Sequence, residues 1–294
     1  MTDIATLNDM QAARRARLRL LSTSVRYVLL FAVGLVMLYP LIWLVGASFK
    51  TNSEIFSGAG FIPENPTLDG YIRGWETSTP YTFGRFFWNS FLIILPKVIG
   101  TAISCTMAAY AFARFDFPLK KILFGSVIAI LLLPNVVTRI PQYILFRDLG
   151  WLDSFLQLWV PSALAGDAFF VFMLVQFLRS LPSDMEEAAR VDGANSLQTL
   201  VYIVVPMLAP ALISVCLFQF MWTMNDFLGP LIYLSSVDKY PVSLALKLSI
   251  DTTEAFEWNR ILAMSVLTIA PALIVFFAAQ RYFIEGISSG GVKG

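Results

Sequence analysis

Long apolar runs alternate along the chain with short polar or proline-containing connections. A helix needs about 20 mostly apolar residues to cross the hydrocarbon core of a bilayer, and each of six runs is near that length. The runs are about Val25–Phe49, Phe86–Phe112, Ile122–Thr138, Leu156–Leu178, Leu200–Trp222 and Ile261–Phe283. Because one short chain could not bury six such helices in a soluble core, the pattern predicts an all-α membrane protein with six transmembrane helices.

The composition supports a membrane protein and excludes several kinds of chemistry. The 294 residues are 57% hydrophobic and 14% charged, whereas soluble domains carry about 25% charged residues. The net charge of +1 provides no overall field that would attract nucleic acid. No histidine occurs, which excludes histidine bases, histidine metal ligands and Ser-His nucleophiles. Cys105 and Cys216 lie far apart in apolar runs, which predicts free thiols rather than a disulfide or a zinc site.

The basic residues predict the orientation of the spans. They cluster in an N-terminal arm, residues 1–24, and in the short connection after the second span. These clusters contain Arg14, Arg15, Arg17, Arg19, Arg114, Lys120 and Lys121. Because Lys and Arg favour the cytoplasmic side, we expect both clusters there. Six spans then place both termini in the cytoplasm, with residues 25–283 as one transmembrane domain and residues 284–294 as a Gly-rich cytoplasmic tail.

The connection between the fourth and fifth spans specifies a short helix at both of its ends. Ser183 and Glu186 have the spacing of a capping box, and further acidic residues in the first turn favour the helix dipole. Glu186 and Arg190 lie four residues apart, as in a helical ion pair. Gly193 stands where a left-handed C-terminal cap belongs. The sequence therefore predicts a helix over residues 184–192.

Two interpretations of this loop helix remain open from the local chemistry. Asn195 or Ser196 can cap a second helix that runs into the fifth span. Ala188 and Ala189 give the loop helix a small, smooth face between carboxylates, which favours close approach of another protein. A rigid helix could transmit a push from such a partner into the two adjoining spans. The other interpretation is a solvated connector that lies on the membrane surface.

The same loop contains a spaced motif. Glu187-Ala188-Ala189 is followed by three residues, Gly193, nine residues and then Ile203-x-Val205-Pro206. This motif resembles the EAA signature of permease subunits in binding-protein-dependent ABC importers, which usually has leucine at the place of Val205. It occupies the connection predicted to be cytoplasmic, about residues 181–206.

The resemblance extends over nearly the whole chain. Phe61–Tyr71 is similar to the first outer loop of maltose-type carbohydrate permeases, with Gly70 where members often have asparagine. Gly286–Gly294 resembles the C-terminus of the second, maltose-permease-like subunit of such importers. Near the end of the fifth span, members commonly have tryptophan at the place of Met224, whereas this chain has Trp222 two residues earlier.

The resemblance implies a type I ABC importer transmembrane domain that forms half of a sugar path across the bacterial inner membrane. Transport would proceed by alternating access, driven by an ATPase whose cleft holds the loop helix. The implied partners are a second, non-identical permease subunit, two copies of the cytoplasmic ATPase, an external solute-binding protein, the sugar and membrane lipid. The implied ATPase-coupling residues are Glu186, Glu187, Ala188, Ala189, Asp192, Gly193 and Pro206.

The resemblance implies that transport is driven by ATP hydrolysis on partner subunits rather than on this chain. No G-x-x-x-x-G-K-[ST] motif occurs, so the chain has no P-loop. ATP and Mg would be used by the partner ATPases, while this chain binds no cofactor and is not an enzyme. The alternative class is an ion-coupled secondary transporter of a small polar solute, because such carriers place ionisable residues within the membrane.

Few ionisable or amide side chains lie within the spans, and these are the candidates for the substrate path. An uncompensated lysine inside a span costs about 2.5–3.5 kcal/mol on insertion scales. Lys97 could therefore pair with Asp167, extend toward the surface, or line a path for an anionic sugar. Aromatic and amide groups of the fifth span could contact a sugar, anchor the helix at the membrane interface or hold helices together. The candidates are Lys97, Asp167, Gln219, Trp222, Asn225 and Asp226.

Overall fold

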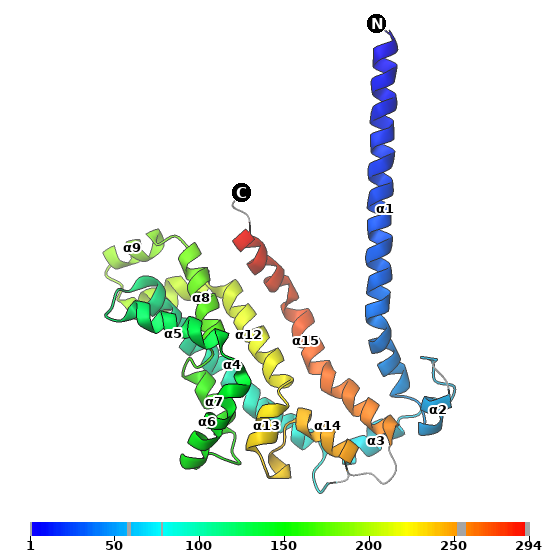
Figure 1. Cartoon of the computed structure of the whole chain (residues 1–294), viewed down its shortest axis with the longest axis vertical. Coiled ribbons are helices and arrows are strands. Elements are labelled where there is room, and N and C mark those ends of the chain that lie inside the picture. The colour runs from blue at the N-terminus through cyan, green and yellow to red at the C-terminus, as the bar shows by residue number, and fades with distance from the viewer. Residues whose placement is uncertain (1, 58–59, 78, 252–256, 292–294) are drawn as a thin grey trace. The chain divides into compact units, whose positions relative to one another are not determined.

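The structure is a computed structural model that describes residues 2–57, 60–77, 79–251 and 257–291; within these ranges, side chains are described at 19, 21–134, 136–247 and 257–281. All regular elements in these ranges are helices (Figure 1). The chain divides into two compact units. The first contains Met1–Tyr71 and Glu257–Val266, and the second contains Ile72–Phe256 and Leu267–Gly294.

The first unit is built around the end of the first long helix. It contains α1 (Thr2–Ala47), α2 (Asn52–Ser57) and the first residues of α3 (Asp69–Glu76) and α15 (Trp258–Gly291). A Cβ atom on Gly46 would lie 1.9 Å from the carbonyl oxygen of Phe61, so only glycine allows this close approach. The hydroxyl groups of Ser48 and Tyr71 share a hydrogen bond of 2.8 Å, which ties the end of α1 to α3.

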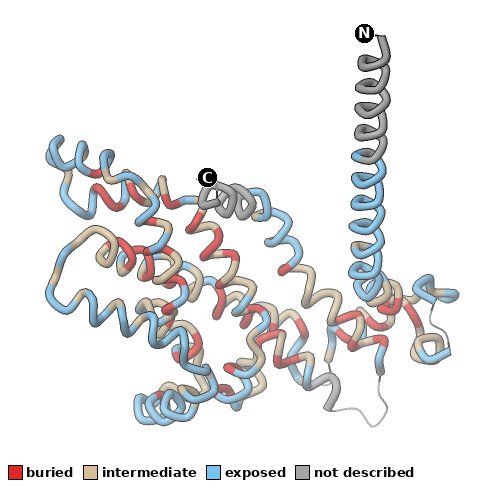
Figure 2. The backbone as a smooth tube through the Cα atoms, turned by 45° about the horizontal axis from the view of Figure 1, so that its top comes forward, coloured by how far each residue is buried: buried red, intermediate tan, exposed pale blue. Residues whose placement is uncertain are grey.

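The apolar part of α1 is open to its surroundings. Every residue from Leu21 to Ile42 except Gly34 is exposed (Figure 2). A helix that is apolar on all sides is typical of a membrane span. The exposure therefore agrees with the first predicted span rather than with a helix of a soluble core.

The second unit contains the remainder of α3 and the other helices, among which α4 is long and continuous and the others are shorter. They are α4 (Phe83–Arg114), α5 (Lys120–Leu132), α6 (Asn135–Asp148), α7 (Leu156–Ala163), α8 (Ala168–Ser180), α9 (Asp184–Val191), α10 (Ser196–Thr199), the π-helix η1 (Leu200–Val204), α11 (Val205–Met207), α12 (Ala209–Met224), α13 (Leu228–Tyr233), the 3₁₀-helix η2 (Val237–Lys239) and α14 (Val242–Asp251), with the remainder of α15. Within this unit, α9 lies at the end opposite to α13 and α14 (Figure 1).

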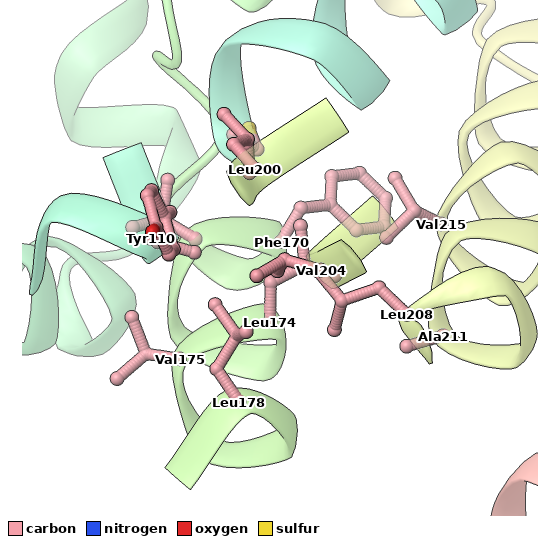
Figure 3. Packing of buried hydrophobic residues seen from close by; sticks show 13 residues of the cluster. Tyr110, Phe170, Leu174, Val175, Leu178, Leu200, Val204, Leu208, Ala211 and Val215 are labelled. Atoms are coloured by element: carbon pink, nitrogen blue, oxygen red, sulfur yellow. The ribbon is translucent and has the colours of Figure 1, made fainter. Parts of the chain in front are cut away.

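The core of the second unit joins α4, α8 and the helices from η1 to α12 (Figure 3). Phe170, Leu174 and Leu178 are fully buried, and their spacing of four residues places them on one stripe of α8. Val204 and Leu208 pack into the same cluster. The segment that follows α9 is therefore part of the core rather than a peripheral connection.

The helices agree with six candidate spans by length and composition. Two bent helix pairs, treated as one span each, raise the number from four to six among the residues searched. The four unbent candidates are Leu21–Ala47, Phe83–Arg114, Leu156–Ser180 and Trp258–Arg281. Their order matches the first, second, fourth and sixth spans predicted from the sequence.

The third predicted span corresponds to a bent pair of helices rather than to one continuous helix. α5 ends at Leu132, and the next segment departs from it at 110°. Pro134 explains the break, because proline disfavours helical dihedrals in the residue before it, and Leu133 is extended with ψ 131°. The 13 residues of α5 reach only about 20 Å at 1.5 Å per residue. A crossing here therefore needs both helices of the bent pair.

The fifth predicted span is also bent. Ser196–Met207 and Ala209–Met224 meet at 79°, and the first of these segments includes the π-helix η1. Pro206 and Pro210 flank the bend, and each lacks the amide hydrogen that would continue the helical ladder. The first segment contacts α9 through α10 and η1, and both segments contribute residues to the core.

The predicted terminal segments merge with the adjoining helices. α1 is continuous from Thr2, so the arm and the first span share one helix. α15 continues to Gly291, which takes in most of the predicted tail. Residue 1 and residues 292–294 lie outside the described residues.

Candidate coupling loop and translocation path

The loop helix predicted over residues 184–192 is confirmed as α9. Its C-terminal end is closed by two backbone hydrogen bonds, from Gly193 to Arg190 at 3.1 Å and from Ala194 to Ala189 at 2.9 Å. Gly193 has φ +85°, the left-handed conformation that a C-terminal glycine cap provides. The helix therefore ends at a defined residue rather than fraying.

The predicted capping box at the start of α9 is wrong. Ser183 has helical dihedrals and its side chain caps no amide; instead, its hydroxyl donates to Oε1 of Glu187 at 3.1 Å. The predicted ion pair between Glu186 and Arg190 is replaced by a pair with Arg114. The first turn is thus held by one local contact and by the tertiary pair with Arg114, which the local sequence could not reveal.

Arg114, the last residue of α4, holds the start of the loop. Its Nε donates to Oε1 of Glu186 at 2.7 Å, and the two side chains are 12% and 4% exposed. Its Nη2 donates to the carbonyl oxygen of Leu181 at 3.1 Å. One guanidinium group therefore fixes both α9 and the segment that leads into it.

Most of the other predicted coupling residues are accessible, whereas Glu186 is buried against Arg114. This placement gives Glu186 an internal contact instead of a position on the docking surface. Ala189 is half-buried, and the accessible members of the predicted set are Glu187, Ala188, Asp192, Gly193 and Pro206. Met185 and Val191 add exposed apolar side chains to the helix. α9 thus presents a surface of apolar, acidic and basic side chains, Arg190 being exposed as well, that a partner could contact.

The second helix of the loop has a complete N-terminal cap. Asn195 accepts a hydrogen bond from the amide of Gln198, and Gln198 accepts one from the amide of Asn195, each at 2.9 Å. This reciprocal pair selects Asn195 over Ser196 as the cap. The capped segment continues into Leu200 and Val204, both buried in the core. The chain therefore passes from α9 into the core within a few residues.

Asp167 and Gln219, two of the predicted path residues, contact one another. Oδ2 of Asp167 accepts hydrogen bonds from Nε2 of Gln219 at 3.2 Å and from Oγ1 of Thr101 at 3.4 Å. Gln219 and Thr101 are buried. This group joins α8, α12 and α4. Among the described residues, Asp167 makes no ion pair with Lys97, so that predicted alternative is not seen.

Lys97 and Asp226 line the same small cavity of the second unit. Ser90 and Thr223 also line it; they are neutral, and their hydroxyl groups donate to backbone carbonyl oxygens of α4 and α12. Lys97 and Asp226 are thus the charged side chains among the residues that line this cavity. The carboxylate of Asp226 also accepts a hydrogen bond of 3.0 Å from the amide of Gly229.

Trp222 and Asn225 lie apart from that cavity wall. Trp222 packs on Phe169 and Phe170 with ring centroids 5.3 and 5.1 Å apart, and half of its surface is exposed. Asn225 is exposed and donates to the carbonyl oxygen of Met221 in its own helix. The structure thus brings four of the six predicted path residues together as two pairs, Asp167 with Gln219 and Lys97 with Asp226, and leaves Trp222 and Asn225 apart.

A polar junction at the other end of the unit was not predicted. Asp153, between α6 and α7, accepts hydrogen bonds from the amides of Ser235 and Ser236 and from Nζ of Lys239 at 2.8 Å. Partial burial opposes ionisation, but the hydrogen bonds from Lys239 and Ser236 outweigh it and hold the pKa of Asp153 well below its usual range. A single acidic residue in a turn gives no sequence signal for partners about 80 residues away.

These features together describe a multi-span membrane protein with a capped helix in the loop between its fourth and fifth candidate spans. The family model for the inner membrane component of binding-protein-dependent transport systems matches residues 100–289. The chain belongs to this family, whose members are permease subunits of ABC importers and work with ATPase and solute-binding partners. It is accordingly a multi-pass inner-membrane protein.

Individual relatives cover nearly the whole chain. A probable ABC transporter permease of Pyrococcus horikoshii is 32% identical over 90% of this chain and 95% of its own length. The arabinooligosaccharides transport system permease of Halalkalibacterium halodurans is 31% identical over 89% and 93%, respectively. A solved bacterial ABC transporter involved in alginate import matches with a TM-score of 0.79 and 25% identity, over 88% of this chain and 95% of that chain.

Proposed function

We propose that this permease subunit forms half of the path for a sugar or sugar derivative. The relatives named for arabinooligosaccharides and for the acidic polysaccharide alginate support a carbohydrate. The observation that carries the coupling role is α9, which is held at its start by Arg114 of α4, is capped at its C-terminal end and leads into a segment buried in the core. The helix is thus built to move as one body with the spans around it.

The proposed mechanism is alternating access driven by a partner. Closure of the ATPase subunits on ATP would displace α9, and the displacement would pass through the capped segment into η1 and α12. Because tightly packed cores move between discrete arrangements rather than deforming smoothly, α8 and α12 would rock together. The path would then open to the opposite side of the membrane.

The proposed complex contains a second, non-identical permease subunit, two copies of the ATPase and an external solute-binding protein. ATP and Mg would be bound by the ATPases, and no cofactor by this chain. The cytoplasmic side would hold both termini and α9. Arg114, Lys120 and Lys121 support this orientation, because basic residues favour the cytoplasmic side.

A purification and an uptake assay test this function. The tagged chain, purified from its native membrane in mild detergent, should bring with it a P-loop ATPase and a second permease. The complex, placed in liposomes with its solute-binding protein, should take up sugar only when ATP is supplied. Uptake that follows an ion gradient without ATP would contradict the proposal and would favour a secondary transporter.

A further inference from the structure

The contact between Arg114 and Glu186 joins two elements that the chain connects only distantly. The two residues are 72 positions apart, and their side chains are nearly inaccessible. Arg114 ends α4, whereas Glu186 lies in the first turn of α9. The docking helix is therefore held directly by a span that does not adjoin it in sequence.

Stability alone does not account for this pair. A buried ion pair loses much of its attraction to the cost of removing both charges from water, so an apolar replacement is often as stable. In addition, Oε2 of Glu186 is buried without a hydrogen-bond partner among the described residues. A buried pair that is not optimised for stability can still define geometry, because the planar guanidinium group fixes the direction of each bond.

The second bond of Arg114 defines that geometry further. Nε binds Glu186, while Nη2 binds the carbonyl oxygen of Leu181. The guanidinium group therefore spans the turn between α8 and α9. Any rotation of α9 about its start must either move Arg114 as well or break one of these bonds.

α4 can carry that movement deep into the unit. It is one helix from Phe83 to Arg114, and its middle carries Lys97 in the cavity wall and Thr101 on Asp167. The 17 residues from Lys97 to Arg114 correspond to about 25 Å of helix. A displacement at α9 thus reaches the predicted path by a second route, separate from the one through η1 and α12.

We propose that Arg114 is a positioning residue for coupling, which links the movement of α9 to α4 through Glu186. The inference rests on the proposed function, because it assumes that a partner ATPase moves α9. A purely structural clamp would hold the fold together without affecting the ratio of transport to ATP hydrolysis. That ratio therefore distinguishes the two roles.

The test uses the complete transporter, with its ATPase and solute-binding protein, in liposomes. Sugar taken up per ATP hydrolysed is measured for the wild type, Glu186→Gln, Arg114→Lys and the exchanged pair Arg114→Glu with Glu186→Arg. Arg114→Lys keeps the positive charge and tests the second hydrogen bond, to the carbonyl oxygen of Leu181. It also provides a second measurement if the yield of assembled transporter with Glu186→Gln is too low. The matched control is Asp116→Asn, which removes a nearby ion pair to Lys120 in which the Asp116 side chain is fully exposed.

We expect Glu186→Gln to lower uptake per ATP by about tenfold, within the usual range of coupling between distant sites. Arg114→Lys should give a smaller loss, the exchanged pair should recover part of it, and Asp116→Asn should match the wild type. Unchanged uptake per ATP in Glu186→Gln and Arg114→Lys, even at reduced yield of complex, would overturn the inference alone. A wild-type complex without ATP-dependent uptake would overturn the proposed function as well.

Discussion

The side-chain amide of Gln219, in α12, donates a 3.2 Å hydrogen bond to the carboxylate of Asp167, at the start of α8. Both residues were predicted as parts of the substrate path, and the structure shows them bound to each other. Thr101 of α4 contributes a second donor. Polar contacts between membrane helices hold spans together, because lipid provides no alternative partner. This group therefore joins three candidate spans.

Gln219→Leu should lower the thermal stability of the purified complex. The substitution removes one of the two side-chain donors to the half-buried Asp167 carboxylate, and a hydrogen bond to a charged group contributes about 1.5–3 kcal/mol. Thermal unfolding in detergent measures the effect. Asn225→Leu is the control, since Asn225 is exposed and binds only its own helix. Equal melting temperatures for both variants would contradict the fastening role.

Gly100→Ala should separate α4 from α7. A Cβ atom on Gly100 would lie 2.5 Å from the Cβ and 2.8 Å from the Cα of Ala163, so a backbone must move. We expect a loss of stability, since overpacking costs about 1–3 kcal/mol. The control is Gly125→Ala, because a Cβ there meets nothing within 4 Å and alanine favours helix. Thermal unfolding should therefore show a lower melting temperature for Gly100→Ala and an unchanged or higher one for Gly125→Ala.

Much of the fold could be predicted because its determinants are local. The apolar runs specify the candidate spans, and the position of Gly193 specifies the end of α9. Asn195 and Gln198 form a cap within four residues of chain. Pro134 lies inside an apolar run that is long enough for one span. Run length alone therefore did not predict the break that this residue causes in the third span.

The contacts of the candidate site could not be predicted in the same way. Glu186 has an available partner at Arg190, four residues away, but binds Arg114 instead. Such a choice depends on which helices pack together, and one sequence does not contain that information. Lys97 and Asp167 are similar: both lie within spans, yet Asp167 binds neutral donors and Lys97 faces a cavity with Asp226.

The junction around Asp153 should make stability depend on acidity. The pKa of Asp153 is lower in the folded chain than its usual value, near 3.9 in an unfolded chain. Its ionised carboxylate therefore contributes to the free energy of unfolding above about pH 3.9, and this contribution is lost as the pH falls toward the lower pKa of the folded chain. Between about pH 5 and about pH 3, the melting temperature of the wild type should fall more than that of Asp153→Asn. Asparagine suits the position, since φ is +55° there and asparagine tolerates left-handed backbone.

Asp148→Asn serves as the control for this titration. Asp148 pairs with Arg147, and both side chains are more than half exposed, so their interaction contributes little. The melting temperature of Asp148→Asn should change with pH as that of the wild type does. If the melting temperature of Asp153→Asn also follows the wild type, the junction does not provide the acid-sensitive part of the stability.

Gly193→Val should impair coupling without preventing insertion into the membrane. The residue has φ +85°, and a Cβ there would meet nothing within 4 Å, so the cost arises from the backbone conformation rather than from a clash. Left-handed backbone costs about 1–2 kcal/mol for most residues, and valine is worse than asparagine. Gly193→Asn is therefore the matched control. Substrate-stimulated ATPase activity should fall in Gly193→Val and remain in Gly193→Asn; normal activity in both would argue against a docking role for α9.

Lys97→Met should affect the uptake of an acidic sugar more than that of a neutral one. Lys97 shares a cavity wall with Asp226, and methionine retains the length of the side chain while removing its charge. A hydrogen bond to a charged group contributes about 1.5–3 kcal/mol, so uptake of an anionic substrate that contacts Lys97 should fall about 10-fold or more.

Asp226→Asn should have the opposite preference, because it removes the negative charge of the same wall. Lys121→Met, at an exposed position in the first turn of α5, is the control for charge alone. Equal uptake of acidic and neutral sugars by Lys97→Met and the wild type, at equal protein levels, would remove Lys97 from the path and leave it as a structural residue of α4.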